Sequence, residues 1–245
     1  MNRNHLLSAY CSMVELLPKI VIRPAILSLF CPHDNLAVMN WARQQLTFIL
    51  LLLLASKAIA QADSLAAVNE IKKFQEDLES EYHDPSKSPL GRHEATLFKG
   101  HDFFSINLNF RVVGRLKLMN NSPFFPMKTT GPRVNEERVY GLLEFSLQGK
   151  NFRLPVYQSS RLMKTQEFRD YLFFPFTDLT NGEESYYGGR YIDLRIPEGE
   201  EIVIDFNKAY NPYCAYASGF SCPIVPKENH LALRITAGIK YQQKK

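Results

Sequence analysis

The spacing of apolar residues changes near Lys99, and this change constrains the fold more than any other feature. After it, apolar and polar residues alternate, as in β-strands that bury one face. The segment 171–176 is apolar on both faces, which is typical of a central strand. Seven or so short strands predict a mainly β chain: an antiparallel β-sandwich or a barrel-like single domain. The expected strands are 110–118, 143–147, 152–156, 171–176, 192–196, 202–206 and 231–239.

One N-terminal amphipathic helix is predicted before the strands, over residues 64–81. Ser64 stands where an N-cap is expected, and the His83-Asp84-Pro85 sequence ends the helix. The other helix face is charged, so we expect one stripe of the helix to pack on a larger body. The residues of that stripe are Leu65, Val68, Ile71, Phe74 (or Gln75), Leu78 and Tyr82.

Residues 39–60 have the features of a signal peptide. One arginine precedes the apolar run LTFILLLLL, and Ala58-Ile59-Ala60 provides small residues at a cleavage site. The run is too short for a membrane-spanning helix, so no stable membrane span is expected after cleavage. Residues 1–38 are then an upstream extension from a wrong start codon. The rest divides into a helix and linker at 61–90 and a β domain at 91–245, in an exported, periplasmic or secreted protein.

Charge excludes one class of partner. The full chain has 29 Lys and Arg against 25 Asp and Glu. Without residues 1–60 the balance is 24 against 23. A nearly neutral domain has no basic surface for nucleic acid, so no nucleic-acid partner is expected.

Polar residues are predicted to gather at one end of the sheet. We expect strands 192–196 and 202–206 to form a hairpin across Pro197–Glu200, which places Asp193 beside Asp205. The long segments 177–190 and 208–230 would then share one edge, the polar rim. Its candidate ligand-binding residues are Asp178, Tyr186, Arg190, Asp205, Asn207, Asn211 and Asn229.

Three functions remain open for the polar rim. It could bind a small molecule or a protein partner. It could instead be purely structural, with ion pairs on the strands and with asparagines that cap the backbone of the long loop. The third is a hydrolase that uses the Asp205, Cys214, Cys222 and His230 cluster, with a metal or a thiol nucleophile.

The two cysteines that follow residue 60 have alternative roles. In an exported chain, a disulfide between Cys214 and Cys222 is the first expectation. Together with His230 they could instead bind a metal, although their spacing is wider than in structural zinc loops. No cofactor is identified. The loop aromatics, Tyr210, Tyr213, Tyr216 and Phe220, favour a local core of the loop over a stacking surface for a ligand.

Several long motifs resemble one bacterial family, the "domain of unknown function 1684" (DUF1684) family, from about Lys72 to Lys240. They are DPSKSPL, FKGHDFF, YGLLEFSLQGKNFRLPVYQ, FFPFTDLTNGEESYYGGRYIDLRIP and IVIDFNKAYNPYCAYASGFSCPIVPKENHLALRITAG. The family pattern falls on Asp178, Thr180, Gly182, Tyr186, Gly189, Arg190, Asp205, Asn207, Asn211, Cys214, Cys222, Pro223, Pro226, Asn229 and Gly238.

The resemblance implies no assigned activity. The chain departs from the family pattern at Tyr187, where relatives tend to have glycine, and at Val225, where they tend to have proline. Family members without export signals also keep both cysteines, and this shifts weight from a disulfide toward a thiol or metal role, because disulfides are rare in reducing compartments. The structural interpretation, a disulfide between Cys214 and Cys222, remains the preferred one.

Overall fold

The computed structural model describes residues 35–241. They form two helices, eight strands and five 3₁₀ turns. The helices are α3 (Asn35–His83) and α4 (Arg92–Leu97). The strands are β1 (Arg111–Leu118), β2 (Phe125–Met127), β3 (Asn135–Leu147), β4 (Lys150–Ser159), β5 (Tyr171–Asp178), β6 (Arg190–Arg195), β7 (Glu201–Asp205) and β8 (His230–Leu231). The 3₁₀ turns are η1 (Leu108–Phe110), η2 (Leu162–Lys164), η3 (Phe206–Lys208), η4 (Tyr213–Ala215) and η5 (Lys227–Asn229).

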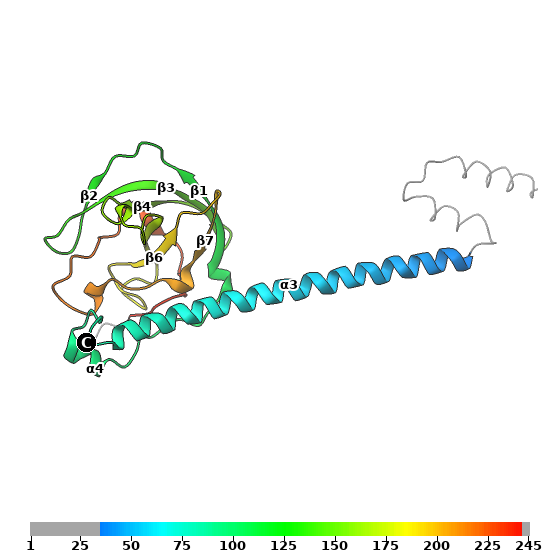
Figure 1. The fold of residues 1–245 in the computed structure, drawn as a ribbon, viewed down its shortest axis with the longest axis horizontal. Helices are drawn as coiled ribbons and strands as arrows, with labels where there is room; N and C mark the ends of the chain where they lie inside the picture. The colour runs from blue at the N-terminus through cyan, green and yellow to red at the C-terminus, as the bar shows by residue number, and fades with distance from the viewer. Residues whose placement is uncertain (1–34, 242–245) are drawn as a thin grey trace, which may run out of the picture. The chain divides into compact units, whose positions relative to one another are not determined.

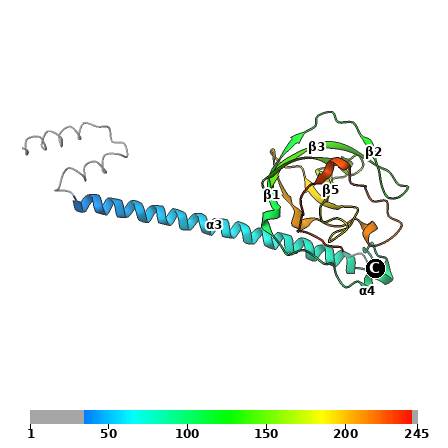
Figure 2. The same ribbon diagram turned by 180° about the vertical axis from the view of Figure 1, so that it is seen from behind.

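The strands belong to one mainly antiparallel sheet that curls into a half-barrel (Figure 1). The order along the sheet is β6-β5-β4-β3-β1-β7, and β2 pairs with β3 at the side. The short β8 runs parallel to β5. Seen from behind, β1 and β3 follow the curved outline of the domain, and β5 lies within it (Figure 2). The prediction of a mainly β, barrel-like antiparallel domain is confirmed.

Strands β3 and β4, which contain the expected strands 143–147 and 152–156, form an antiparallel hairpin. Leu147 pairs with Lys150, so that Gln148 and Gly149 form the two-residue turn. Their φ angles are +49° and +75°, the left-handed conformation that a tight hairpin of this kind requires. The expected central strand is also confirmed, because β5 lies between β4 and β6.

The predicted hairpin between residues 192–196 and 202–206 is wrong. β6 pairs with β5 and β7 pairs with β1, at opposite edges of the sheet. Asp193 therefore lies opposite Phe173, and Asp205 lies opposite Arg111. The alternating pattern of each strand fits any antiparallel partner, so the short connection alone did not determine the pairing.

The main core fills the concave side of the sheet. The alternate residues of each long strand point into it, and the expected last strand contributes as well. Residues 231–239 keep the predicted alternation of burial, yet only His230–Leu231 pairs as a strand. The C-terminal members of this core are Leu231, Leu233, Ile235 and Ala237.

The helix begins earlier than predicted. α3 starts at Asn35, and Ser64 lies inside it instead of capping it. Leucines and alanines through residues 46–62 are good helix formers, so the helix continues across the expected boundary. The expected stripe is buried at Ile71 and Tyr82, whereas Leu65 is exposed.

No helix within residues 35–241 is long and apolar enough to cross a membrane. The signal peptide at 39–60 stays a prediction. Most of the expected upstream extension, residues 1–34, lies outside the described residues.

Candidate functional site

Arg190 is fully buried and binds the backbone of the C-terminal segment. Its NH1 donates to the carbonyls of Ala237 and Ile239, at 2.6 and 3.2 Å. Its NH2 donates to the carbonyl of Ile235 at 2.8 Å and to Asp178 Oδ2 at 2.5 Å. The Arg190 guanidinium thus donates to the carbonyls of three alternate residues, which a neighbouring strand would otherwise supply with donors. This explains how Ile235 and Ala237 keep their carbonyls bonded although residues 232–238 belong to no strand.

Both carboxylate oxygens of Asp178, the partner of Arg190, also accept hydrogen bonds. Its Oδ1 accepts from the backbone N–H of Thr180 at 2.6 Å and of Ile235 at 3.5 Å. Burial lowers the pKa of Arg190, and the Asp178 carboxylate opposes that shift. The arginine therefore stays charged, because its ordinary pKa is far above neutrality. The two residues form a buried ion pair that closes the core.

Asp205 and Asn207 join the sheet to the segment before β1. The side chain of Asn207 accepts from Asn107 N at 2.9 Å and donates to Asn107 O at 3.0 Å, as a paired β-strand residue would. Asp205 Oδ1 accepts from Asn207 N at 3.0 Å, and Asp205 Oδ2 accepts from Arg111 at 2.7 Å. Both side chains are buried. Their polar atoms are occupied by the protein itself.

Asn229 bridges two strands where prolines interrupt their pairing. β4 and β5 pair directly only at Tyr157 and Phe173, because Pro155 and Pro175 have no N–H to donate. Asn229 Nδ2 donates to both proline carbonyls, at 2.9 and 2.8 Å, and its Oδ1 accepts from the Tyr157 hydroxyl at 3.1 Å. The buried amide thus completes the sheet.

Asn211 and Tyr186 complete the predicted ligand set, and both contact the C-terminal segment. Asn211 Nδ2 donates to the Tyr216 hydroxyl at 2.8 Å and to Lys240 O at 3.2 Å. Tyr186 is buried with its ring edge-on to Tyr241, 5.2 Å between centroids. We call all seven of these residues the polar scaffold: Asp178, Tyr186, Arg190, Asp205, Asn207, Asn211 and Asn229.

The cysteines and His230 do not form one cluster. Cys214 and Cys222 form a disulfide. The exposed His230 has its Nδ1 3.0 Å from Thr177 Oγ1, and Asp205 is paired with Arg111. Within residues 35–241, no three His, Cys, Asp or Glu side chains are placed to hold a metal ion. The geometry that a metal-assisted or thiol hydrolase would need at the polar rim is therefore not assembled.

A cavity lies elsewhere, on the outer face of β5 and β6, under the segment 210–223. Its volume is about 260 Å³. None of the polar scaffold lines it. Its walls are Arg133, Asn135, Glu137, Ser159, Leu162, Tyr171, Phe173, Tyr191, Tyr210, Pro212, Tyr213, Phe220, Ser221, Cys222 and Pro223, and we call it the tyrosine cavity.

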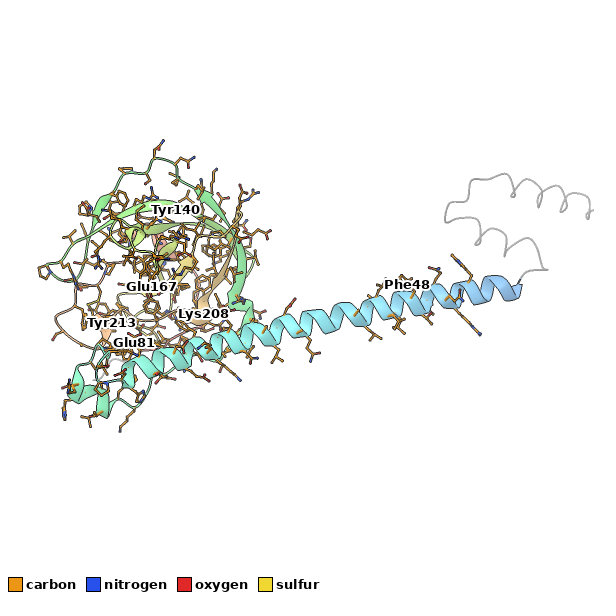
Figure 3. The ribbon with its side chains drawn as sticks, in the orientation of Figure 1. Phe48, Glu81, Tyr140, Glu167, Lys208 and Tyr213 are labelled. Carbon is orange, nitrogen blue, oxygen red and sulfur yellow. A yellow bond between two sulfur atoms is a disulfide. The ribbon has the colours of Figure 1, made fainter. Side chains whose placement is uncertain are left out.

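The four tyrosines of the cavity direct their hydroxyls to other protein groups. Tyr171 and Tyr210 both donate to Asp193 Oδ1, at 2.8 and 2.6 Å. Tyr191 donates to a backbone carbonyl in the covering segment. Tyr213 donates to Glu81 Oε1 of α3 at 2.8 Å, and the two side chains lie together in Figure 3. What the tyrosines offer to the cavity is therefore ring surface.

Glu137 is the buried acid of the cavity. Only 5% of its surface is exposed, and its Oε2 has no hydrogen-bond partner. Burial raises the pKa of Glu137 to about 7, although the Ser159 hydroxyl and the charge of Arg161 lower it. A carboxyl group that changes charge near neutral pH beside a cavity is a common mark of a functional site.

Sequence reasoning missed Glu137, because the expected strand begins at residue 143 and leaves Glu137 outside it, whereas β3 begins at Asn135 and contains a β-bulge. The β3–β4 register shifts between Val139 and Gly141, so one extra residue enters β3. After the bulge the odd-numbered residues, such as Leu143 and Phe145, face the main core, whereas the odd-numbered Glu137 and Val139 before it face the outer side. A β-bulge reverses the phase of the alternation, and no simple residue pattern marks it. The loop aromatics Tyr210, Tyr213 and Phe220 were the one available signal, because they do line the cavity.

Known proteins place the chain in a family. It is similar to the solution NMR structure of an uncharacterized protein from Haloarcula marismortui, with a TM-score of 0.59 and 28% sequence identity. That match covers 75% of this chain and 98% of the other. No curated protein matches the sequence. The model of the family described as "Protein of unknown function (DUF1684)" matches residues 96–240, which is more than half of the chain. The chain therefore belongs to the DUF1684 family.

Proposed function

We propose that this protein is an exported domain that binds a small ligand in the tyrosine cavity. The observation that carries the proposal is Glu137, which is buried at the cavity with one carboxylate oxygen unpartnered. Burying a carboxylate oxygen without a partner is costly, and a ligand that donates to it would offset this cost. Aromatic walls around a few polar groups are the usual composition of small-molecule sites.

The polar scaffold supports the cavity indirectly. Tyr191 and Tyr210 exchange backbone hydrogen bonds of 2.9 and 3.0 Å, which hold the covering segment against β6. Arg190 directly precedes Tyr191, and Asn211 directly follows Tyr210. Both are fixed by their buried hydrogen bonds. The scaffold therefore holds both sides of the cavity in place. Most of its polar atoms are engaged with the protein; the buried Arg190 Nε and Asn211 Oδ1 have no hydrogen-bond partner in the described part of the chain, and neither residue lines the cavity.

Export rests on two features of the chain. Residues 39–60 have the pattern of a cleaved signal peptide. The Cys214–Cys222 disulfide is of a kind that persists in oxidising compartments. N-terminal sequencing of the protein recovered outside the cytoplasm is the test: a chain that starts at Gln61 supports export, and one that keeps residues 39–60 opposes it.

Filling the cavity is expected to abolish binding. Leu162 lines the cavity and is half-buried, so Leu162→Trp places a larger side chain where a ligand would lie. We expect 2-phenylethanol, a neutral aromatic probe, to bind the full-length chain with a Kd on the order of 1 mM. The Leu162→Trp variant is expected to weaken this binding at least about tenfold, which is about 1.4 kcal/mol. The measurement is an NMR titration.

The matched control is Lys164→Trp. Lys164 belongs to the same 3₁₀ turn, is exposed and does not line the cavity. This variant should bind the probe as the parent does. Equal binding by the parent and Leu162→Trp, or no binding by the parent, would overturn the proposal.

A further inference from the structure

We propose that the ligand of the tyrosine cavity is an organic ammonium ion, a primary amine attached to a flat apolar group. This inference rests on the proposed function and adds the ligand's chemical class. Three independent features carry it: the ring surfaces that face the cavity, the free oxygen of Glu137, and the placement of the charged groups around it.

The ring surfaces favour a flat cationic ligand. Phe173 and Tyr191 meet edge to face with centroids 4.8 Å apart, and Tyr210 stands edge-on to Tyr191 at 5.9 Å. Because the tyrosine hydroxyls donate to protein acceptors, the tyrosines contribute ring surface to the cavity lining. The face of an aromatic ring carries partial negative charge and attracts ammonium groups, while an apolar ligand group packs against the same surface.

The unpartnered carboxylate oxygen of Glu137 favours a ligand group that donates a hydrogen bond to it. An ionised carboxylate only accepts hydrogen bonds, whereas an ammonium group only donates them. Charge-assisted hydrogen bonds of this kind are shorter and stronger than neutral ones. Ser159 and Asn135 lie beside Glu137 in the lining and can accept the remaining ammonium protons.

The charges around Glu137 allow a cation to enter. Two exposed arginines lie near it, Arg133 in the lining and Arg161 after β4, and solvent screens both. Asp193 stands behind Tyr171 and Tyr210 as the acceptor of their hydroxyls. The remaining titratable groups of the lining are Tyr171, Tyr191, Tyr210 and Tyr213, and burial raises the pKa of each above its usual range, so that they stay neutral.

The pH dependence of binding has a definite sign. A folded-state pKa of about 7 means that the carboxyl group of Glu137 is protonated at pH 5 and ionised at pH 8. An ammonium ligand binds the ionised form, so its affinity should rise about tenfold per pH unit below pH 7 and level off above it. A neutral ligand should show no such rise, and a carboxylate ligand should weaken over the same range.

Three probes of one shape test the inference with the full-length chain. They are 2-phenylethylamine, 2-phenylethanol and 3-phenylpropionate, titrated by calorimetry or NMR at pH 5 and pH 8. At pH 8 the amine is expected to bind at least about tenfold tighter than the alcohol. At pH 5 the amine should bind about 100-fold more weakly than at pH 8.

Glu137→Gln removes the charge at nearly constant volume. In this variant the amine and the alcohol should bind within about threefold of each other, and the amine should lose its pH dependence. Glu136→Gln is the control, because Glu136 is the preceding residue of β3, is exposed and does not line the cavity. It should keep the full preference for the amine.

The outcomes separate the inference from the function on which it rests. If the alcohol or the acid binds the parent chain as tightly as the amine, the ligand class is wrong and the cavity remains a binding site. If Glu137→Gln keeps the preference, Glu137 does not select the cation, and the inference falls as well. If none of the three probes binds, both the inference and the proposed function are overturned. The pH profile of the parent chain decides the matter even if Glu137→Gln fails to fold.

Discussion

Replacing Arg190 by methionine is expected to lower the free energy of unfolding by at least about 5 kcal/mol. The change leaves Asp178 as a buried, unpaired carboxylate and removes the donors to three carbonyls. Domains of this size are stable by about 5–15 kcal/mol, so the variant should be largely unfolded or close to it. Urea denaturation of the full-length chain, followed by circular dichroism, measures the loss.

The control for this prediction is Arg195→Met in the same strand. Arg195 is exposed and its NH1 contacts Asp170 Oδ1 at 2.8 Å, so its loss should cost less than about 1 kcal/mol. If the Arg190 variant were as stable as the Arg195 variant, the buried network would not hold the C-terminal segment, and the assignment of the polar scaffold to structure would fail.

Replacing Asn229 by aspartate is expected to cost about 3–5 kcal/mol. The new side chain has the same shape and can still accept from Tyr157. It cannot donate to the carbonyls of Pro155 and Pro175. A carboxylate against two carbonyl oxygens is repelled, so the loss should be larger at pH 8 than at pH 4, where a protonated acid can donate to one of them. Thermal and urea unfolding at both pH values check this.

Asn151→Asp is the matched control, because the Asn151 side chain acts only as a hydrogen-bond acceptor. Asn151 is exposed in β4, and its Oδ1 receives the Ser146 hydroxyl. An aspartate keeps that acceptor, so the stability should change by less than about 0.5 kcal/mol. A loss at Asn229→Asp no larger than this would show that the amide bridge between the two prolines is dispensable.

Alternation of apolar residues was enough to predict most strands and the fold class. In the structure, β3 and β4 are joined by a local turn, because Gln148 and Gly149 bring adjacent segments together. The partner of β7 could not be predicted from a local turn. β7 pairs with β1, about 90 residues earlier in the chain, and alternation is equally compatible with several partners.

The predicted site residues include strand ends, such as Asp178, Arg190 and Asp205, and residues of 3₁₀ turns, such as Asn207 and Asn229. Their hydrogen bonds run to other groups of the protein. Arg190 could not be identified as a substitute for a strand, because its three carbonyl partners come from the last segment of the chain. The apolar alternation of residues 231–239 indicated an ordinary strand and gave no sign that a side chain would take the place of its neighbour.

The cavity depends on tertiary structure that single strands do not reveal. Glu137 reaches it through a β-bulge, and Tyr210 and Phe220 reach it through a long loop that the scaffold holds down. Burying the Glu137 carboxylate costs stability, because the nearby Arg133 and Arg161 are exposed and neither is buried with it as a partner. A buried, unpaired carboxylate that lowers the stability of the fold and lines a cavity is expected at a functional site, where selection for function keeps it.

The central claim is that the polar scaffold holds the fold while the tyrosine cavity holds the ligand. A chemical-shift map of the full-length chain titrated with 2-phenylethylamine at pH 8 tests it most directly. The account predicts shifts concentrated at Glu137, Phe173 and Tyr191, with Asp178 and Asn207 unchanged. Shifts concentrated at Asp178 and Asn207, with the cavity residues unchanged, would contradict it.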